Sequence, residues 1–295
     1  SLFHIVDFME EIAKQENKTE AKTFYKSLFV IVAPIAIQNF ITATVNSADV
    51  IMLGYVSQTA IAAVSLACRV QFLLTMFFTG LSSGVIMLTV QYWGKKDATS
   101  IRTLMGIALR ISATAGIIFA AVTFFFSKQI MYIFTNDPNL VENGVIYLRT
   151  VSITYFCLSV SQVYQALLKS LEHVKTVTCI TFIALGLNIL LNATFIFGLF
   201  GAPKLGLFGV ALATSISRII ELFISILISK RIKEVKLSLS AIFCKNKLLT
   251  KDFLKYSLPA IGNEFVWGAA WATYSVILGR MGEEIVAANS VISTI

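Results

Sequence analysis

Charged residues are scarce in this 295-residue sequence, and so are prolines. Charged residues make up 14% of the chain and hydrophobic residues 57%, whereas soluble domains average about 25% charged and roughly 45–50% apolar residues. Only four prolines interrupt the chain. This composition excludes an ordinary soluble domain and predicts a protein surrounded by lipid.

Motifs typical of enzymes, metal centres and secretion are also absent. The four cysteines show no CxxC spacing, so we expect neither a metal site nor a disulfide framework. No GxxxxGK[ST] phosphate loop occurs, so we do not expect ATP hydrolysis to drive this protein. We also expect no enzymatic activity and no cofactor. Asp7, Glu10 and Glu11 stand where a signal peptide would carry positive charge. We therefore expect residues 1–27 to form a solvated cytoplasmic tail.

Apolar runs of membrane-spanning length recur along the chain. About 20 apolar residues in a helix cross a hydrocarbon core of roughly 30 Å. The run 111–126 lacks the alternation that barrel strands need. The sequence therefore predicts an all-α polytopic membrane protein with an eighth span beginning near its end. The seven complete predicted spans are 28–55, 60–93, 102–126, 145–168, 174–200, 206–229 and 254–279.

The sequence has a formal charge of +8, and its basic residues concentrate on one side of the predicted membrane spans. Of the 24 Lys and Arg residues, three lie in odd-numbered loops, at Lys128, Lys204 and Arg280, and four lie within spans and away from the tail and the even-numbered loops. The other 17 lie in or beside the N-terminal tail and the even-numbered loops. Because positive segments resist translocation, this bias predicts that the N-terminus is cytoplasmic. We expect the protein to lie in the plasma membrane. We expect no nucleic-acid partner.

An internal repeat predicts two lobes. A shift of 225 residues places Pro34 on Pro259 and Phe40 on Phe265, and it also aligns Leu53-Gly54, Ala62-Ala63 and Ser65 with Leu278-Gly279, Ala287-Ala288 and Ser290. Six spans separate the copies, so the lobes form a parallel repeat about the membrane normal. We expect a lobe at 28–229, a cytoplasmic loop at 230–253 and the start of a second lobe, truncated, at 254–295.

Three stretches resemble the multidrug and toxic compound extrusion (MATE) family. Residues 34–97 end in GLSSGVIMLTVQYWGKKD, residues 187–214 read LNILLNATFIFGLFGAPKLGLFGVALAT, and NEFVWG begins at Asn263. They are similar to the family's first two, fifth and sixth, and seventh helices. The resemblance implies two six-helix lobes, a central cavity, and export of cationic amphipathic compounds in exchange for Na⁺ or H⁺. Departures are Leu171-Glu172, where the family usually has Gly-Asp, and Arg69, where it usually has Gln.

Asp49 is the main candidate for cation coupling. A carboxylate inside a membrane span costs several kcal/mol, so it faces protein, a partner or water. A desolvated Asp can exchange a proton near neutral pH or bind Na⁺ when ionised. The resemblance implies the cation site of the first lobe at this position, and the alternative is a structural, hydrogen-bonded Asp. Arg69 begins the next span at a similar depth, where it pairs with Asp49 or snorkels to the headgroups.

Asn188 and Asn192 are candidates for the same site. They are four residues apart and share one face of the fifth predicted span. Their amides both donate and accept hydrogen bonds. The resemblance implies that they complete the site around Asp49, and the alternative is hydrogen bonding between helices, worth roughly 0.6 kcal/mol per bond.

Glu264 is the second predicted cation-binding carboxylate, because it lies near mid-membrane and matches an acidic position of the family. Trp267 and Trp271 share its helix face, where they stack on a planar cation or simply pack. Pro34 is either a hinge or a static kink of the first span. Two more charges, Arg218 and Glu221, are three residues apart and neutralise each other, so we place neither in the site.

Three functions agree with these features. The first is the cation-coupled antiporter, a monomer whose partners are the lipid bilayer and small organic substrates. The second is a flippase for lipid-linked oligosaccharides, which cationic cavity walls would favour. The third is a membrane scaffold or receptor whose polar residues only stabilise helix packing.

Overall fold

The computed structural model describes residues 51–231 and 246–281, together with 33, 36, 37, 40–42, 44 and 45. All regular structure in these residues is helical. The elements are α2 (Gln58–Gly94), α3 (Ala98–Phe125), α4 (Ser127–Phe134), α5 (Pro138–Ser170), α6 (Val174–Phe197), the 3₁₀ turn η1 (Leu199–Gly201), α7 (Gly206–Arg231) and α9 (Lys247–Met281).

Side-chain caps determine where several of the helices begin. Ser57 accepts a hydrogen bond from the backbone N–H of Ala60 at 3.0 Å, and Asn246 Oδ1 accepts one from Leu249 at 3.1 Å. Asp97 accepts from both the hydroxyl and the N–H of Ser100. These bonds lower the pKa of Asp97, so its contribution to stability is present above the ordinary pKa and is lost as the pH falls through the lowered value.

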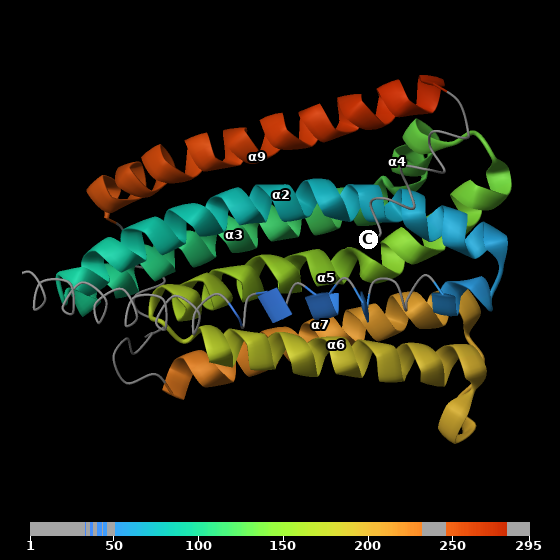
Figure 1. Cartoon of the computed structure of the whole chain (residues 1–295), viewed down its shortest axis with the longest axis horizontal. Helices are drawn as coiled ribbons and strands as arrows, with labels where there is room; N and C mark the ends of the chain where they lie inside the picture. Colours follow the sequence, from blue (N-terminus) through green and yellow to red (C-terminus); the bar gives the residue numbers. More distant parts are fainter. Residues whose placement is uncertain are drawn as a thin grey trace, which may run out of the picture.

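The long helices lie side by side, with α5 in the middle of the bundle (Figure 1). α5 packs against α2 and α3 on one side and against α7 on the other, and α6 packs on α7. The most apolar window of α5 is 61% buried, compared with 28–33% for α2, α3, α6 and α7. The outer helices therefore turn apolar side chains outward, as expected for a bundle in lipid.

Five helices are long and apolar enough to cross a membrane, among the residues that the structure describes. They are α2, α3, α5, α6 and α7, and they confirm the predicted second to sixth spans. Most of the predicted first span and the start of an eighth lie outside the described residues. α9 covers the predicted seventh span but begins earlier and carries Lys251, Asp252 and Lys255 in its first turns, and it is not among the five.

Two local features differ from the expectations. The short helix α4 was not predicted and packs on α5. The turn between α5 and α6 holds Glu172 at φ +64°, a left-handed conformation that costs a residue with a Cβ roughly 1–2 kcal/mol. The departure from Gly-Asp does not cause this strain, because Leu171, which stands at the Gly position, has an ordinary φ of −94°, and Glu172 stands at the Asp position.

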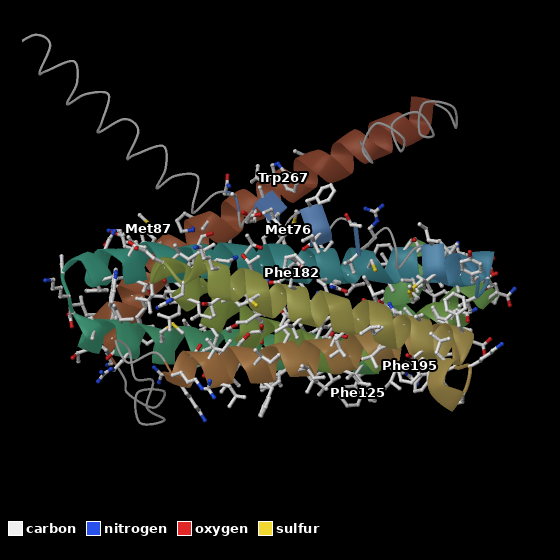
Figure 2. All side chains as sticks on the ribbon, turned by 60° about the horizontal axis from the view of Figure 1, so that its bottom comes forward. Met76, Met87, Phe125, Phe182, Phe195 and Trp267 are labelled. Carbon is white, nitrogen blue, oxygen red and sulfur yellow. The ribbon has the colours of Figure 1, made fainter. Side chains whose placement is uncertain are left out.

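Glycines of α2 allow α9 to approach closely. A Cβ added at Gly80 would lie 2.5 Å from Ile261 Cα and 2.6 Å from Ile261 N, and one added at Gly84 would overlap Ser257 Oγ. This small-xxx-small spacing is typical of helices that pack backbone to backbone in membranes. Figure 2 shows α9 crossing α2 at an angle and diverging from it toward the end of α2 that holds Gln58.

We expect Gly80→Ala to destabilise the fold by about 1–3 kcal/mol, because the new methyl group overlaps the α9 backbone. Gly262→Ala is the matched control, since its Cβ would meet nothing within 4 Å and alanine favours helix. Melting temperatures of the two purified variants would be compared. Equal melting temperatures would show that the crossing is not a tight contact.

Candidate functional site

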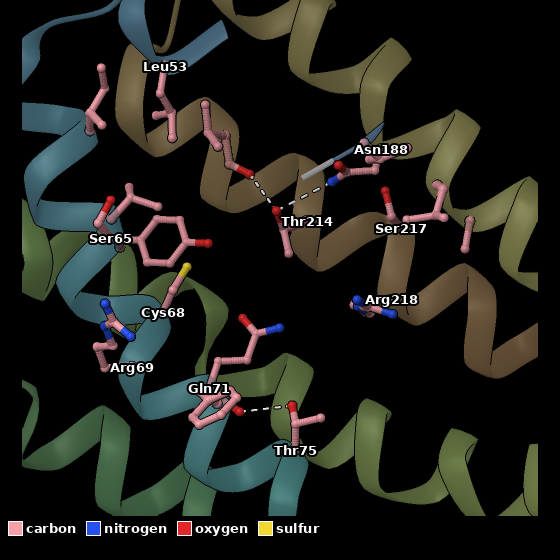
Figure 3. A pocket seen from close by; sticks show the side chains of 18 residues that line it. Leu53, Ser65, Cys68, Arg69, Gln71, Thr75, Asn188, Thr214, Ser217 and Arg218 are labelled. Carbon is pink, nitrogen blue, oxygen red and sulfur yellow. Dashed lines mark hydrogen bonds between the residues drawn. The ribbon is translucent and has the colours of Figure 1, made fainter. Parts of the chain in front are cut away.

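A cavity of about 530 Å³ opens inside the bundle between α2, α6 and α7 (Figure 3). Its wall combines hydrocarbon with hydroxyl, thiol, amide and guanidinium groups. Such a mixture suits an amphipathic compound that has an apolar body and a polar head. The described residues that line it are Val45, Leu53, Ile61, Val64, Ser65, Cys68, Arg69, Gln71, Phe72, Thr75, Tyr147, Ala184, Leu185, Asn188, Val210, Thr214, Ser217 and Arg218.

Helical spacing brings the polar side chains of α2 to one wall. Ser65, Cys68, Arg69, Gln71 and Thr75 recur at intervals of three or four residues within the lining. Thr75 also donates its hydroxyl to the carbonyl of Gln71 at 2.9 Å. This bond stabilises a polar side chain at membrane depth and leaves the helix unbroken.

The opposite wall carries a chain of side-chain hydrogen bonds from α6 to α7. Asn192 Nδ2 donates to Asn188 Oδ1 at 3.3 Å, and Asn188 Nδ2 donates to Thr214 Oγ1 at 3.4 Å (Figure 3). Asn192 is fully buried and Asn188 is buried at the cavity surface. The structure thus brings the two predicted amides together and adds Thr214 to them.

Arg69 lines the same cavity from α2 and is exposed to it. Its predicted partner Asp49 lies outside the described residues, as does Pro34. In the sequence, Asp49 stands four residues after Val45 and four before Leu53, and both of those residues line the cavity. The pairing of Arg69 with Asp49 therefore stays a prediction.

Arg218 lines the cavity from α7, and Glu221 lies behind it. Arg218 Nη1 and Glu221 Oε2 are 2.7 Å apart, with the side chains 30% and 5% exposed. Glu221 Oε1 accepts a second bond from Gln165 Nε2 of α5 at 2.8 Å. The expected pair therefore forms, and the guanidinium of Arg218 is in addition part of the cavity wall.

Glu264, the second predicted cation-binding carboxylate, lies on α9, which contributes no described residue to the cavity wall. Glu264 is half-buried on α9 and is not part of the cavity lining. Trp267, one turn later, is 56% exposed and lies near Met76 (Figure 2). Trp271 belongs to α9, and its side chain lies outside the described part. Stacking of a planar cation on these rings stays a prediction.

Several lining residues escaped sequence reasoning, chiefly Tyr147, Thr214 and Ser217. A signal was present on α7, where Thr214, Ser217, Arg218 and Glu221 recur at helical spacing in an apolar run. Such a stripe faces protein or water in a membrane helix. Tyr147 gave no comparable signal, because a single tyrosine in a span is common packing.

An apolar bundle of membrane-length helices around a cavity of mixed polarity defines a multi-pass membrane protein. The family model MatE matches residues 34–194. The chain belongs to this family.

The similar proteins agree with this assignment. The chain is 27% identical to "Uncharacterized transporter YisQ" of Bacillus subtilis, over 91% of this chain and 58% of that protein. It is 28% identical to "Probable multidrug resistance protein NorM" of Rhizobium meliloti, over 68% of this chain and 43% of that protein. The chain thus spans less than two thirds of the length of these relatives.

A solved structure described as the outward-facing conformation of a multidrug resistance MATE family transporter of the MOP superfamily has the same fold. It matches with a TM-score of 0.79 at 22% identity, over 88% of this chain and 58% of that one. The expected all-α, MATE-like architecture is thereby confirmed at the level of fold.

Proposed function

We propose that this chain forms the first lobe and the beginning of the second lobe of a secondary active antiporter that exports amphipathic organic compounds. The observation that carries the proposal is the 530 Å³ cavity, whose wall joins hydrocarbon to polar groups inside an apolar bundle. The family relationship and the multidrug resistance names of relatives support it. The protein would lie in the plasma membrane as a monomer, with its N-terminus in the cytoplasm.

The coupling ion, Na⁺ or H⁺, is proposed to bind at Asp49. The oxygens of Asn188 and Thr214 are at the cavity surface, and Asn192 lies directly behind them. Carboxylate, amide and hydroxyl oxygens are suitable ligands for a small hard cation. A carboxylate among them would bind Na⁺ when ionised, or take up a proton when the site is dry.

Alternating access would use the crossing of α2 and α9. The cavity lies along the part of α2 nearer Gln58, whereas the close contacts at Gly80 and Gly84 lie toward Gly94. The basic loops predict that the Gly94 end is cytoplasmic. The described conformation would then be closed toward the cytoplasm, and separation of α9 from α2 would open the path. Glu264 and Trp267 on α9 would contribute from the second lobe.

A flippase for lipid-linked oligosaccharides is the second candidate. The observation that favours it is the pair of guanidinium groups in the wall, Arg69 and Arg218, since Arg binds phosphate in a planar, bidentate manner. The cavity also bears on the cargo expected from the sequence. Among its described lining residues no carboxylate faces a cationic substrate, so a cationic cargo rests on Asp49, Glu264 and the second lobe.

The test uses everted vesicles that contain the complete protein and a fluorescent amphipathic compound in the medium. We expect the compound to accumulate in the lumen when the lumen holds the higher Na⁺ or H⁺ concentration. Accumulation should stop when an ionophore for that cation abolishes the gradient. Accumulation that is indifferent to both gradients would refute the antiporter and favour the flippase or a protein without transport activity.

A further inference from the structure

Among the described residues that line the cavity, the two charged ones are both positive. Arg69 enters from α2 and Arg218 from α7, and no Asp or Glu is present among the described lining residues (Figure 3). A guanidinium within a membrane span costs at least about 2.5 kcal/mol, so its retention there is a default sign of function. Two guanidinium groups on different helices thus line the same cavity.

Arg218 is held in place from behind. Glu221 is 4% exposed, and its two carboxylate oxygens accept one bond from Arg218 at 2.7 Å and one from Gln165 at 2.8 Å. Gln165 Nε2 also donates to Ser161 at 3.0 Å. The carboxylate therefore fixes the orientation of Arg218 while lying outside the cavity.

Arg69 is the charge in the described wall that has no ion-pair partner within the described part of the chain. Arg218–Glu221 is the ion pair found among the described residues, and it is neutral as a unit. Arg69 forms no ion pair with a described residue. Ser65 and Gln71, on the same wall, add neutral donors, and Phe72, Val64 and Ile61 add hydrocarbon. The described wall is thus positive, rich in donors and apolar at its edges.

We propose that this cavity binds the oxyanion head of an amphipathic compound, a carboxylate, sulfonate or phosphate, with Arg69 as the principal charge in a wall that also contains the guanidinium of Arg218. The proposal rests on the proposed function, because the cavity is taken as part of the transport path. It names a cargo opposite in charge to the one that the family resemblance implies. The carboxylate of Asp49 would offset the positive charge of Arg69 only when Asp49 is ionised and close to Arg69. The test therefore includes a variant of Asp49.

The experiment measures binding to the complete protein in phosphatidylcholine nanodiscs by fluorescence polarisation. Two probes share a dansyl group and a hexyl chain, and they end in a carboxylate or in a trimethylammonium group. We expect Arg69→Gln to weaken binding of the carboxylate probe at least tenfold and to change binding of the ammonium probe less than twofold. Arg69→Lys should retain part of the affinity, because it keeps the charge and loses the planar fork.

Matched variants separate charge from folding. Ser65→Asp places a carboxylate one helical turn from Arg69 and should weaken the carboxylate probe at least tenfold more than Ser65→Asn, which has the same size and no charge. Lys128→Gln removes a cation from α4, outside the cavity lining, and should change neither affinity. Asp49→Asn should strengthen binding of the carboxylate probe or leave it unchanged. If Arg69→Gln does not fold, the pair of Ser65 variants decides.

The proposal is overturned if Arg69→Gln binds the carboxylate probe as wild type does, or if both probes weaken equally. It is also overturned if Ser65→Asp and Ser65→Asn bind the carboxylate probe equally. The assay needs no ion gradient. Failure of gradient-driven accumulation in vesicles would therefore refute the antiporter and leave the anion site intact. Conversely, equal binding of the carboxylate probe by wild type and Arg69→Gln would refute the anion site and leave the antiporter intact.

Discussion

Asp49→Asn should reduce gradient-driven accumulation of substrate in everted vesicles at least about tenfold, while the protein still reaches the membrane in normal amounts. Asparagine keeps the size of the side chain but neither exchanges a proton nor supplies a negative charge for Na⁺. Movement of substrate down its own concentration gradient should persist, because the amides and hydroxyls of the wall remain. Initial rates with and without the imposed cation gradient separate the two effects.

Asp137→Asn is the control for the Asp49 variant. Asp137 caps α5 outside the cavity, accepting a bond from the N–H of Asn139 at 2.9 Å, and asparagine caps helices equally well. It should transport as wild type does. If Asp49→Asn also accumulates substrate at the wild-type rate, coupling at Asp49 is refuted and Glu264 becomes the carboxylate to test.

Arg218→Met should cost about 3–5 kcal/mol of folding free energy, the largest stability effect that we expect. The variant leaves the carboxylate of Glu221 buried without its ionic partner, which is far more costly than losing the attraction itself. Only the bond from Gln165 would remain to it among the described contacts. Denaturant titration of the purified complete protein measures the loss.

The double variant Arg218→Met with Glu221→Gln should recover most of that loss. The amide of the new Gln carries no charge and still accepts the bond from Gln165. A non-additive cycle of this kind is the signature of direct coupling between two residues. If Arg218→Met alone lowers the folding free energy by less than about 1 kcal/mol, then Glu221 is solvated or paired elsewhere, and it does not orient Arg218.

Much of the fold could be predicted from the sequence, because lipid imposes a simple rule on apolar length. The runs at 60–93 and 206–229 became α2 and α7 with small changes at their ends. The start of α9 at Lys247 was missed because its first turns are polar, and hydropathy does not detect a helix that begins in water. Asn246, which caps that helix, was the local signal.

The site was less predictable, because its decisive contacts join distant parts of the chain. The spacing of Asn188 and Asn192 predicted their shared face, and their hydrogen bond agrees with it. Gln165 and Glu221 form a hydrogen bond although they are 56 residues apart in the sequence, and helical periodicity does not predict a contact over that separation. Arg218 was excluded because its neighbour neutralises it, although a neutral pair can still present one of its members to a cavity.

Exchange itself is the central claim, and ion flux measured in the absence of any imposed cation gradient tests it most directly. Vesicles containing the complete protein would receive an inward concentration gradient of substrate alone, and ²²Na⁺ release or lumenal pH would be followed. The antiporter predicts that substrate entry drives Na⁺ or H⁺ out of the lumen, and that Asp49→Asn abolishes this flux. Substrate entry unaccompanied by movement of either cation would contradict the account.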